Sequence, residues 1–492
     1  MAVTSLLFFL SALAAALVFW RMPTKARLPW LLLISAAFLG VWNWQFVLIL
    51  ALFGLVNFWL GLKIEKSLST GRQPWKILGI AFNILVLFVF KYNRFFLPSL
   101  LKLFGAQEAS TALQILLPIG LSFLVVQMIS YLVDVANQRL KAERDLVKFG
   151  VYTLYFPKLL SGPVERARLF LPRLDAPLPF DSIMFNRSLS LIVIGLLRKL
   201  VFANPLFSLI PADAFTAPAQ YAGQHLVLYL LAYAFALFND FAGYTSIVRG
   251  ISLWFGIELS NNFSLPYFSR NFTEFWSRWH ISLSNWLRDY LFFPISRALM
   301  KRYPKREHFL NIIVPPLATM LVSGMWHGLS WSLLVWGGLH GMYQISERLP
   351  GLLKPSAPLD ERPRWRNALG IGVTFVLVVL AWLPFRMDLP VAWTYLVGMF
   401  KWIRPDFFLF KRYITADTTW LSWTPLNLPN PILLVALAAA LGFDLILRQK
   451  GGEKHLWALP RWLQMLLMVL LLISILASVF AESTAPFVYQ AF

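Results

Sequence analysis

The amino-acid sequence predicts an all-α protein that crosses a membrane many times. Of its 492 residues, 58% are hydrophobic, compared with roughly 45–50% in soluble domains. Runs of about 18 or more apolar residues recur from one end of the chain to the other, and a helix of that length spans a hydrocarbon layer of ~30 Å. Short basic connections separate the runs. Because several runs are long enough for two passages, we expect about 11 membrane helices.

The apolar runs leave no segment large enough to form a soluble domain of its own. We therefore expect no catalytic domain outside the membrane. The runs lie near residues 3–20, 29–62, 77–99, 112–136, 187–211, 225–256, 309–346, 367–385, 431–447 and 462–481.

The chain is strongly basic, with 44 Lys and Arg against 23 Asp and Glu and a formal net charge of +21. In a soluble protein this balance would suggest a nucleic-acid partner. Here the basic residues gather between apolar runs, around residues 21–27, 63–76 and 297–306. Such connections face the cytoplasm and its anionic lipids, so the charge predicts topology rather than nucleic-acid binding.

The first apolar run resembles the core of a secretory signal, but no positive residue precedes it and Arg21, Lys25 and Arg27 follow it. This order predicts an uncleaved first helix with its N-terminus outside. Cysteine is absent, which excludes disulfides, cysteine-bound zinc and thiolate catalysis. Phosphate-binding loops, dinucleotide fingerprints, nucleophile elbows and metal-spaced His clusters are absent too.

Two segments interrupt the helices. Residues 155–163 contain two prolines and a glycine inside an apolar stretch, which favours either a re-entrant loop lining a tunnel or a plain helix end with a cytoplasmic turn. In residues 269–294 aromatic residues and leucines recur every three or four positions, while Arg278 and Arg288 fall opposite them. This pattern predicts one interfacial helix that begins at Asn271 and contains a Glu274–Arg278 pair.

His327 lies in the middle of an apolar region at residues 310–343. Ionisable residues inside a membrane span are costly and usually functional. Gly324 and Gly328 allow close approach of backbone or substrate, and Trp326 and Trp331 are suited to wall a pocket. The low dielectric favours the neutral imidazole that a general base requires. The alternative is a histidine that hydrogen-bonds between helices.

The other candidate groups have simpler interpretations. His340 would lie ~20 Å from His327 if one helix continued unbroken, and we interpret it as structural. His280, beside the aromatic face, has the position of an interfacial histidine. Asp134 and Asp240 lie inside apolar runs, where ion pairs are expected with basic residues such as Arg198 or Arg249.

Several motifs together resemble the membrane-bound O-acyltransferase family, and within it the bacterial branch that includes the alginate O-acetylation membrane protein. The resemblance runs from about residue 115 to the C-terminus. It is most specific in the motifs that begin at Glu274 and at Trp326. The motifs are LPIGLSF at 117–123, SYLVD at 130–134, FPKLLSGP at 156–163, DFAGY at 240–244, PY at 266–267, APFVY at 485–489, EFWSRWHISLS at 274–284 and WHG at 326–328.

The resemblance implies a ring of helices around a tunnel through the membrane. It divides the chain into N-terminal transmembrane helices at 1–110, a catalytic core at 111–350 and C-terminal transmembrane helices at 351–492. His327 would be the catalytic histidine, and His280 the second signature residue near the cytoplasmic mouth. Further candidates for the tunnel are Trp326, Ser330, Trp331, Trp279, Ser284, Asp240, Tyr244 and Arg288.

The implied donor is an acyl thioester such as acetyl-CoA, entering from the cytoplasm, with no tightly bound cofactor and no metal. A neutral His327 would deprotonate an acceptor hydroxyl while Trp326 or Ser330 stabilises the oxyanion. Basic residues suited to the CoA phosphates, or simply to a solvated cytoplasmic face, are Arg288, Lys301, Arg302 and Lys305.

The chain departs from the branch at two places. Residues 242–246 read Ala-Gly-Tyr-Thr-Ser where Ser-Gly-Tyr-Ser-Asp is usual, and residues 294–298 read Pro-Ile-Ser-Arg-Ala where a glycine-rich turn is expected. The first change removes a hydroxyl and a carboxylate. Neither affects the expected fold, but both bear on the acceptor.

The function expected from the resemblance is O-acetylation of an extracytoplasmic polysaccharide or cell-wall polymer. The protein would lie in the bacterial inner membrane, and a separate secreted or anchored esterase-like partner would complete the transfer. Alternatives within the family are D-alanyl transfer to teichoic acid from a carrier protein and acylation of peptidoglycan. From a different class, the alternative is a proton-coupled transporter or channel in which His327 relays protons.

Overall fold

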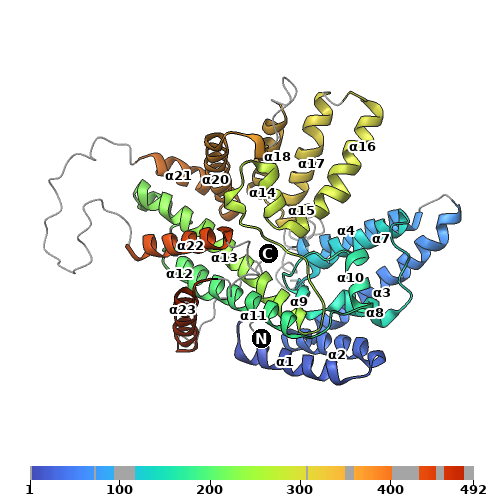
Figure 1. Cartoon of the computed structure of the whole chain (residues 1–492). Coiled ribbons are helices and arrows are strands. Elements are labelled where there is room, and N and C mark those ends of the chain that lie inside the picture. The colour runs from blue at the N-terminus through green and yellow to red at the C-terminus, as the bar shows by residue number, and fades with distance from the viewer. Residues whose placement is uncertain are drawn as a thin grey trace, which may run out of the picture.

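The computed structural model describes residues 3–70, 74–93, 117–305, 308–349, 359–401, 431–449 and 459–480, and the motif at 485–489 lies outside them. Within these ranges every regular element is a helix (Figure 1). Among the described residues, eight helices are long and apolar enough to cross a membrane, and four shorter apolar helices accompany them. The predicted all-α, polytopic membrane fold is confirmed. The count of about 11 membrane helices and the three-part division stay predictions.

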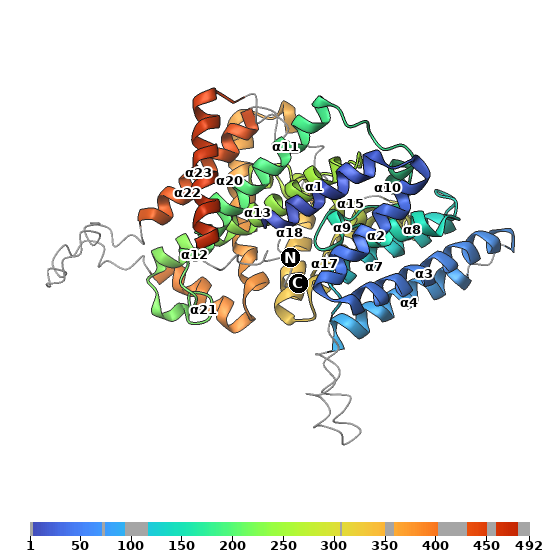
Figure 2. The same cartoon turned by 90° about the horizontal axis from the view of Figure 1, so that it is seen from below.

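The N-terminal helices form one side of the molecule (Figures 1 and 2). Most of α7 is buried, since α3, α4 and α10 all pack on it and its side chains contribute to a core shared with α1, α2 and α8. These helices are α1 (Leu6–Arg21), α2 (Thr24–Trp42), α3 (Trp44–Ser67), α4 (Pro74–Lys91), α7 (Leu121–Ala136), α8 (Leu146–Leu154) and α10 (Ala167–Asp175).

Two helices cross the centre, α11 (Ser182–Leu196), continued by a π-helical turn, η2 (Leu197–Ala203), and the 31-residue α13 (Gly223–Leu253). Of the 18-residue apolar stretch considered in each helix, 83% is buried in α13, compared with 11% in α4. A helix that is apolar all round is buried by other helices, as α13 is here. Gly195 lets the two helices touch, because a Cβ there would lie 2.6 Å from the carbonyl oxygen of Gly243.

A tight hairpin of α17 (Phe309–His327) and α18 (Trp331–Arg348) carries the histidine motif at 326–328. Gly324 and Gly337 allow the hairpin to close, because a Cβ at either would collide with a backbone carbonyl of the facing helix. On its other side α18 packs against α20 (Arg364–Arg386). The remaining C-terminal helices are α21 (Leu389–Phe400), α22 (Pro431–Gln449) and α23 (Arg461–Phe480).

The prediction of one interfacial helix at residues 269–294 is wrong. The segment contains α14 (Phe272–Arg278), α15 (Ile281–Leu287), a π-helical turn, η5 (Arg288–Phe292), and α16 (Phe293–Arg302). The chain breaks at His280, whose φ of 43° lies in the left-handed region. Local periodicity did not reveal the break, because the aromatic pattern continues on both sides. The predicted start is confirmed, since Asn271 caps the backbone N–H of Glu274 at 2.7 Å.

Residues 155–163 leave α8, form the single turn α9 (Phe156–Leu159) and continue to α10. Nearly all of their side chains are buried. The phenol of Tyr155 hydrogen-bonds the hydroxyl of Ser252 on α13 at 2.8 Å, and the backbone N–H of Ser161 donates to the phenol of Tyr244 at 3.2 Å. This burial against protein favours the re-entrant loop over an exposed turn.

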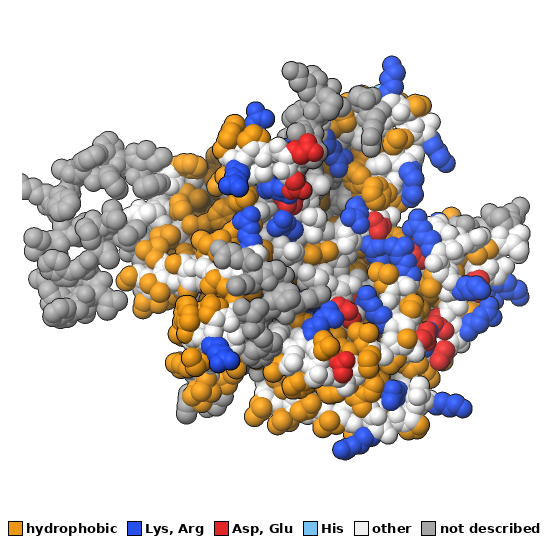
Figure 3. Space-filling view, in the orientation of Figure 1, with side chains coloured by type: hydrophobic (Ala, Val, Ile, Leu, Met, Phe, Trp, Pro, Cys, Tyr) orange, Lys and Arg blue, Asp and Glu red, His pale blue; other side chains and the backbone are white. Residues whose placement is uncertain are grey.

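The outer surface is apolar over large areas (Figure 3). Large side chains on outward faces are exposed, including Leu6 (73%), Ile77 (70%) and Leu52 (63%). In water such a surface would drive association, but the hydrocarbon of a membrane covers it. Lys and Arg with a few Asp and Glu gather near the centre of this face and toward α3 and α8 (Figure 3). The surface therefore agrees with a multi-pass membrane protein.

Candidate active site

His327 is the last residue of α17 and lies inside a box of aromatic rings. Its ring centroid is 4.9 Å from that of Trp326, 5.3 Å from Trp336 on α18 and 5.2 Å from Phe385 on α20. Only 5% of the residue is exposed. Gly328 then lets the chain turn, and the hydroxyl of Ser330 caps the N-terminus of α18. The site is therefore built where three helices meet at the end of α17.

His280 reaches the same region from the break between α14 and α15. Its ring centroid lies 6.4 Å from Trp326, 4.9 Å from Phe241 and 6.1 Å from Phe123. Trp326 thus contacts both His280 and His327, although the two histidines are 47 positions apart in the sequence. The structure brings together the two histidines that the sequence motifs singled out.

The left-handed backbone conformation at His280 is stabilised by hydrogen bonds to Asn262, a residue that lies before α14. The backbone N–H of Ile281 donates to the carbonyl of Asn262 at 2.9 Å, and the hydroxyl of Ser282 donates to its side-chain oxygen at 2.7 Å. A non-glycine residue at positive φ persists only where its surroundings impose it, and such positions cluster at functional sites. The strain at His280 therefore supports a functional position for its ring.

Helix α14 is anchored by charge. Arg270 and Arg278 both bind the carboxylate of Glu274, at 3.1 and 2.7 Å. Burial acts to raise the pKa of Glu274, but the hydrogen bonds from Arg270 and the charges of both arginines outweigh it and hold the pKa below its ordinary value. The carboxylate therefore stays ionised, and the predicted Glu274–Arg278 pair is confirmed.

His340 lies much closer to His327 than an unbroken helix would place it. The turn at Gly328 folds α18 back onto α17, so that Trp336 contacts both histidine rings, at 5.3 and 5.1 Å. His340 is fully buried among Phe275, Trp276 and Trp336. The sequence suggested ~20 Å between the two histidines, an estimate that was wrong because the helix does not continue.

Two tryptophans of the site change the sequence-based interpretation. The indole N–H of Trp326 donates to the carbonyl of Ser122 at 3.2 Å, so it is already engaged and cannot serve the oxyanion as predicted. The indole N–H of Trp336 is buried and meets no hydrogen-bond acceptor within the part of the chain that the structure describes. Its ring contacts His327. Trp336 is therefore the better-placed donor.

Lys91, at the end of α4, was not identified from the sequence. Its ammonium donates to the carbonyl of Trp326 at 2.5 Å and lies 5.2 Å from the centroid of that indole. The phenol of Tyr92 donates to the neighbouring carbonyl of Met325, also at 2.5 Å. A basic residue at the end of an apolar run normally marks a cytoplasmic boundary, so the sequence signal was ambiguous. In the fold the pair clamps the end of the helix that carries His327.

We expect Lys91→Met to lower kcat for acyl transfer by roughly tenfold to hundredfold with little change in KM, because a small displacement of His327 is costly. Lys91→Arg should restore part of the activity, since it can donate to the same carbonyl. Tyr92→Phe removes one neutral hydrogen bond and serves as the matched control, with a loss of about threefold. Wild-type kcat in a folded Lys91→Met protein would contradict this role.

The buried carboxylates form the ion pairs with basic residues that the sequence predicted. Asp240 on α13 pairs with Lys199 at 2.5 Å. Arg198 binds Asp444 on α22 at 2.9 Å. The structural ion pair inferred for Asp240 is therefore confirmed, and Lys199, which lies in η2, is a partner that the sequence did not single out.

Asp134 also forms the expected ion pairs, with arginines other than the two named as examples. It accepts a hydrogen bond from the phenol of Tyr290 at 2.6 Å, and guanidinium groups of Arg139 and Arg168 lie 3.7 and 3.6 Å away. Arg198 and Arg249 are not its partners. The contacts of Asp134 with Tyr290 and Arg168 depend on how α7, α10 and η5 pack together. A local sequence pattern does not specify that packing.

The other tunnel candidates are dispersed. Trp331 is 76% exposed at the start of α18, whereas His327 is 5% exposed, and the role of Trp331 as a wall of the histidine pocket stays a prediction. Tyr244 holds the segment at 155–163, and Trp279 is buried among Phe275, Trp382 and other rings. Ser330 caps α18. Tyr244, Trp279 and Ser330 therefore support the fold around the site.

Ser284 and Arg288 line a cavity of about 180 Å³ beside the site. Its walls come from α14, α15, η5, α17 and α18, and Arg348 lies at its edge over the ring of Phe292. Trp276 lines the cavity and contacts Trp336, at 6.0 Å between centroids. Two indole rings therefore separate this cavity from His327.

The proposed phosphate-binding residues lie at the end of α16 and just beyond it. Lys301, Arg302 and Lys305 are exposed, and α16 contains no buried residue. This exposure leaves them available to a phosphate but equally to water. Across the described residues, no group of three or more His, Asp or Glu is arranged to hold a metal ion.

Comparison with known proteins adds the family context. Residues 38–385 match the membrane-bound O-acyltransferase family. The chain is 33% identical over 433 residues to a probable alginate O-acetylase of Azotobacter vinelandii, covering 86% of this chain and 81% of that protein.

Two relatives have other named substrates. A peptidoglycan O-acetyltransferase of Helicobacter pylori is 29% identical over 385 residues, covering 73% of this chain and 70% of that protein. A teichoic acid D-alanyltransferase of Streptococcus thermophilus is 31% identical over 366 residues, covering 66% and 86%. The matched region includes both histidine motifs.

Proposed function

The chain belongs to the membrane-bound O-acyltransferase family, and from this premise we propose that it O-acetylates an extracytoplasmic polysaccharide or cell-wall polymer. The protein is an O-acyltransferase of the multi-pass membrane class. Acetyl-CoA is the proposed donor, the bacterial inner membrane the proposed location, and a secreted or anchored esterase-like protein the proposed partner. The relatives named for alginate and peptidoglycan O-acetylation support an acetyl group and an envelope polymer.

The observation that carries the proposal is the pair of histidine rings on either side of Trp326 in an aromatic, buried site. In this surrounding His327 accepts the proton of an acceptor hydroxyl, and the alkoxide attacks the thioester carbonyl. The tetrahedral intermediate then expels the thiolate, which takes the proton back from the imidazolium. The products are an O-acyl ester and a free thiol, so the reaction needs no further reactant.

The oxyanion of the intermediate requires a donor that is not already engaged. The indole N–H of Trp336 meets this requirement, because it is buried beside His327 and meets no acceptor within the described residues. Desolvated donors of this kind stabilise transition-state charge strongly. We therefore assign the oxyanion to Trp336.

Trp336→Phe is expected to lower kcat by roughly 10²–10³, with little change in KM. Trp382→Phe is the matched control, since it removes another buried indole N–H from the same cluster, on a ring that packs against Trp336. Both variants are compared by steady-state kinetics at equal folded concentration. Equal activity of the two variants would remove Trp336 from this role.

The cavity lined by Ser284 and Arg288 is the proposed approach for the donor. Arg288 and Arg348 at its rim can pair with phosphate, and Trp276 and Trp336 lead from it toward His327. Further positive charge comes from three exposed residues at the end of α16 and just beyond it, Lys301, Arg302 and Lys305.

The proposal is tested with purified protein in liposomes, radiolabelled acetyl-CoA or D-alanyl carrier protein, and a panel of envelope polymers. We expect label from acetyl-CoA in an O-ester on a polysaccharide or on the partner protein. The relative named for teichoic acid D-alanylation makes preference for the carrier protein the main alternative. Solute flux down a gradient without thioester turnover would instead establish a transporter.

A further inference from the structure

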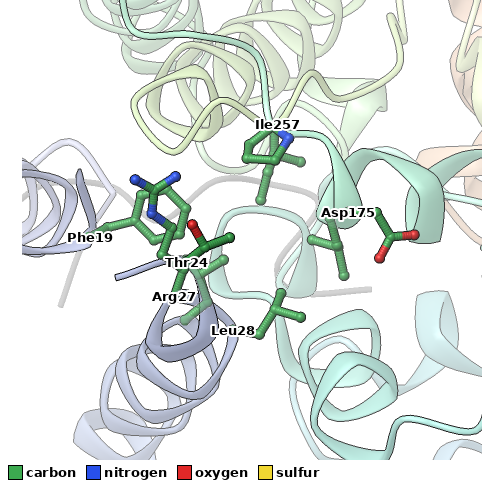
Figure 4. A pocket seen from close by; sticks show the side chains of 9 residues that line it. Phe19, Thr24, Arg27, Leu28, Asp175 and Ile257 are labelled. Atoms are coloured by element: carbon green, nitrogen blue, oxygen red, sulfur yellow. The ribbon is translucent and has the colours of Figure 1, made fainter. Parts of the chain in front are cut away.

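We infer that a cavity between α1, α2 and α10 binds the phosphate and glycerol region of an anionic phospholipid. The cavity has a volume of about 180 Å³ and lies between the turn that joins α1 to α2 and the chain after α10 (Figure 4). Its residues belong to the N-terminal core, apart from the core that contains both site histidines. The inference is therefore independent of the proposed catalytic function.

The floor of the cavity is apolar and well packed. Phe19, Leu31 and Ile257 line it and are each at most 2% exposed, and Leu174 completes it. Leu28 lines the side nearest the helix α2 (Figure 4). A floor of this kind accommodates hydrocarbon and excludes water.

Arg27 supplies the charged wall. Its guanidinium lies over the rings of Phe19 and Trp20, 5.3 and 5.0 Å from their centroids, and its Nε donates to the carbonyl of Met22. These contacts orient the side chain. Its two terminal nitrogens have no carboxylate within ion-pair distance among the residues that the structure describes. An oriented guanidinium with free terminal N–H groups is suited to bind a phosphate through two hydrogen bonds.

The charges around Arg27 favour an anion. The first turn of α2 contains no acidic residue. Asp175 also lines the cavity, but its carboxylate binds the ammonium of Lys148 at 2.7 Å. Arg21 and Lys25 lie in the same exposed turn. The cavity lining itself carries one positive and one negative charge, and the attraction for an anion comes from Arg27 together with the basic turn beside it.

The position within the membrane identifies the source of the phosphate. Apolar α1 and α2 meet at a basic turn, which by the positive-inside rule lies at the cytoplasmic surface with its anionic lipids. A volume of 180 Å³ corresponds to about six water molecules, which is enough for part of a lipid only. Leu13 and Leu17 on α1 are exposed, 37% and 51%, and can carry the remaining acyl chain. A lipid held here would fasten α1 and α2 to α10.

The test is a thermal-unfolding titration of delipidated protein in a non-ionic detergent. Added phosphatidylglycerol is expected to stabilise the wild-type protein, and Arg27→Met should weaken the apparent lipid affinity at least about tenfold. Arg21→Met removes the same charge from the same turn and should change the affinity less than about twofold. Inorganic phosphate at the same concentration should have no effect.

Three outcomes would overturn the inference. They are equal lipid affinity of Arg27→Met and wild type, equal stabilisation by inorganic phosphate alone, and equal losses in the two arginine variants. Should Arg27→Met fail to fold, Leu28→Trp decides the question, because it fills the cavity without changing the charge. Retained lipid affinity in that variant would also refute the site.

Discussion

Replacing His327 by alanine is expected to lower the rate of acyl transfer by about 10²–10⁴, the usual contribution of a general base. The imidazole lies at the end of α17 within contact of Trp326, Trp336 and Phe385. Alanine removes the proton acceptor and leaves a gap in the aromatic box, yet α17 keeps its close contacts with α18, Gly324 against Leu333 and Met320 against Gly337. Turnover of radiolabelled thioester measures the loss.

His340→Phe is the matched control for this experiment. It removes a second buried imidazole from the adjoining cluster but keeps a ring against Phe275 and Trp276. We expect its activity to stay within about tenfold of wild type, since packing changes of this size are usually tolerated. A folded His327→Ala protein that transfers acyl groups normally would remove His327 from the mechanism.

Asp240→Ala is expected to cause the largest loss of stability, about 3–5 kcal/mol. The carboxylate pairs with Lys199 at 2.5 Å, and the side chains are 1% and 3% exposed. Removal of Asp240 leaves an ammonium in an apolar interior without its counter-charge, which is more costly than the loss of the pair itself. The measurement is the thermal unfolding midpoint in detergent, followed by size-exclusion chromatography.

The double variant Lys199→Met/Asp240→Leu separates the ion pair from a catalytic role of Asp240. Both charges are gone, so most of the stability should return, while activity should follow stability rather than the presence of the carboxylate. If the double variant were stable but fully inactive, Asp240 would act in the reaction. An undiminished unfolding midpoint for Asp240→Ala would show that the pair is not buried as described.

The membrane class of the fold follows from composition, because a bilayer requires apolar helices of nearly fixed length. The capped start of α14 at Asn271 was likewise predictable, since an N-cap depends on residues three positions apart. His327 was identifiable from its position inside an apolar run. In each case the deciding interaction is local or is made with the lipid.

The geometry of the site was not predictable in the same way. The break at His280 depends on Asn262, and the clamp on Trp326 comes from Lys91, more than 200 positions away. Trp336 had no signal beyond its place in an aromatic-rich helix. Its importance appears only where α18 folds back on α17.

By itself the sequence determined that this protein is a bundle of membrane helices with histidines in apolar surroundings, because both properties depend on which side chains lipid accepts. Tertiary structure alone decided that His280 and His327 share Trp326, that Lys199 pairs with Asp240, and that Trp331 is exposed at the start of α18. The physical reason is that contacts between helices depend on their relative rotation and on single glycines at their crossings, and a local pattern of residues does not specify either.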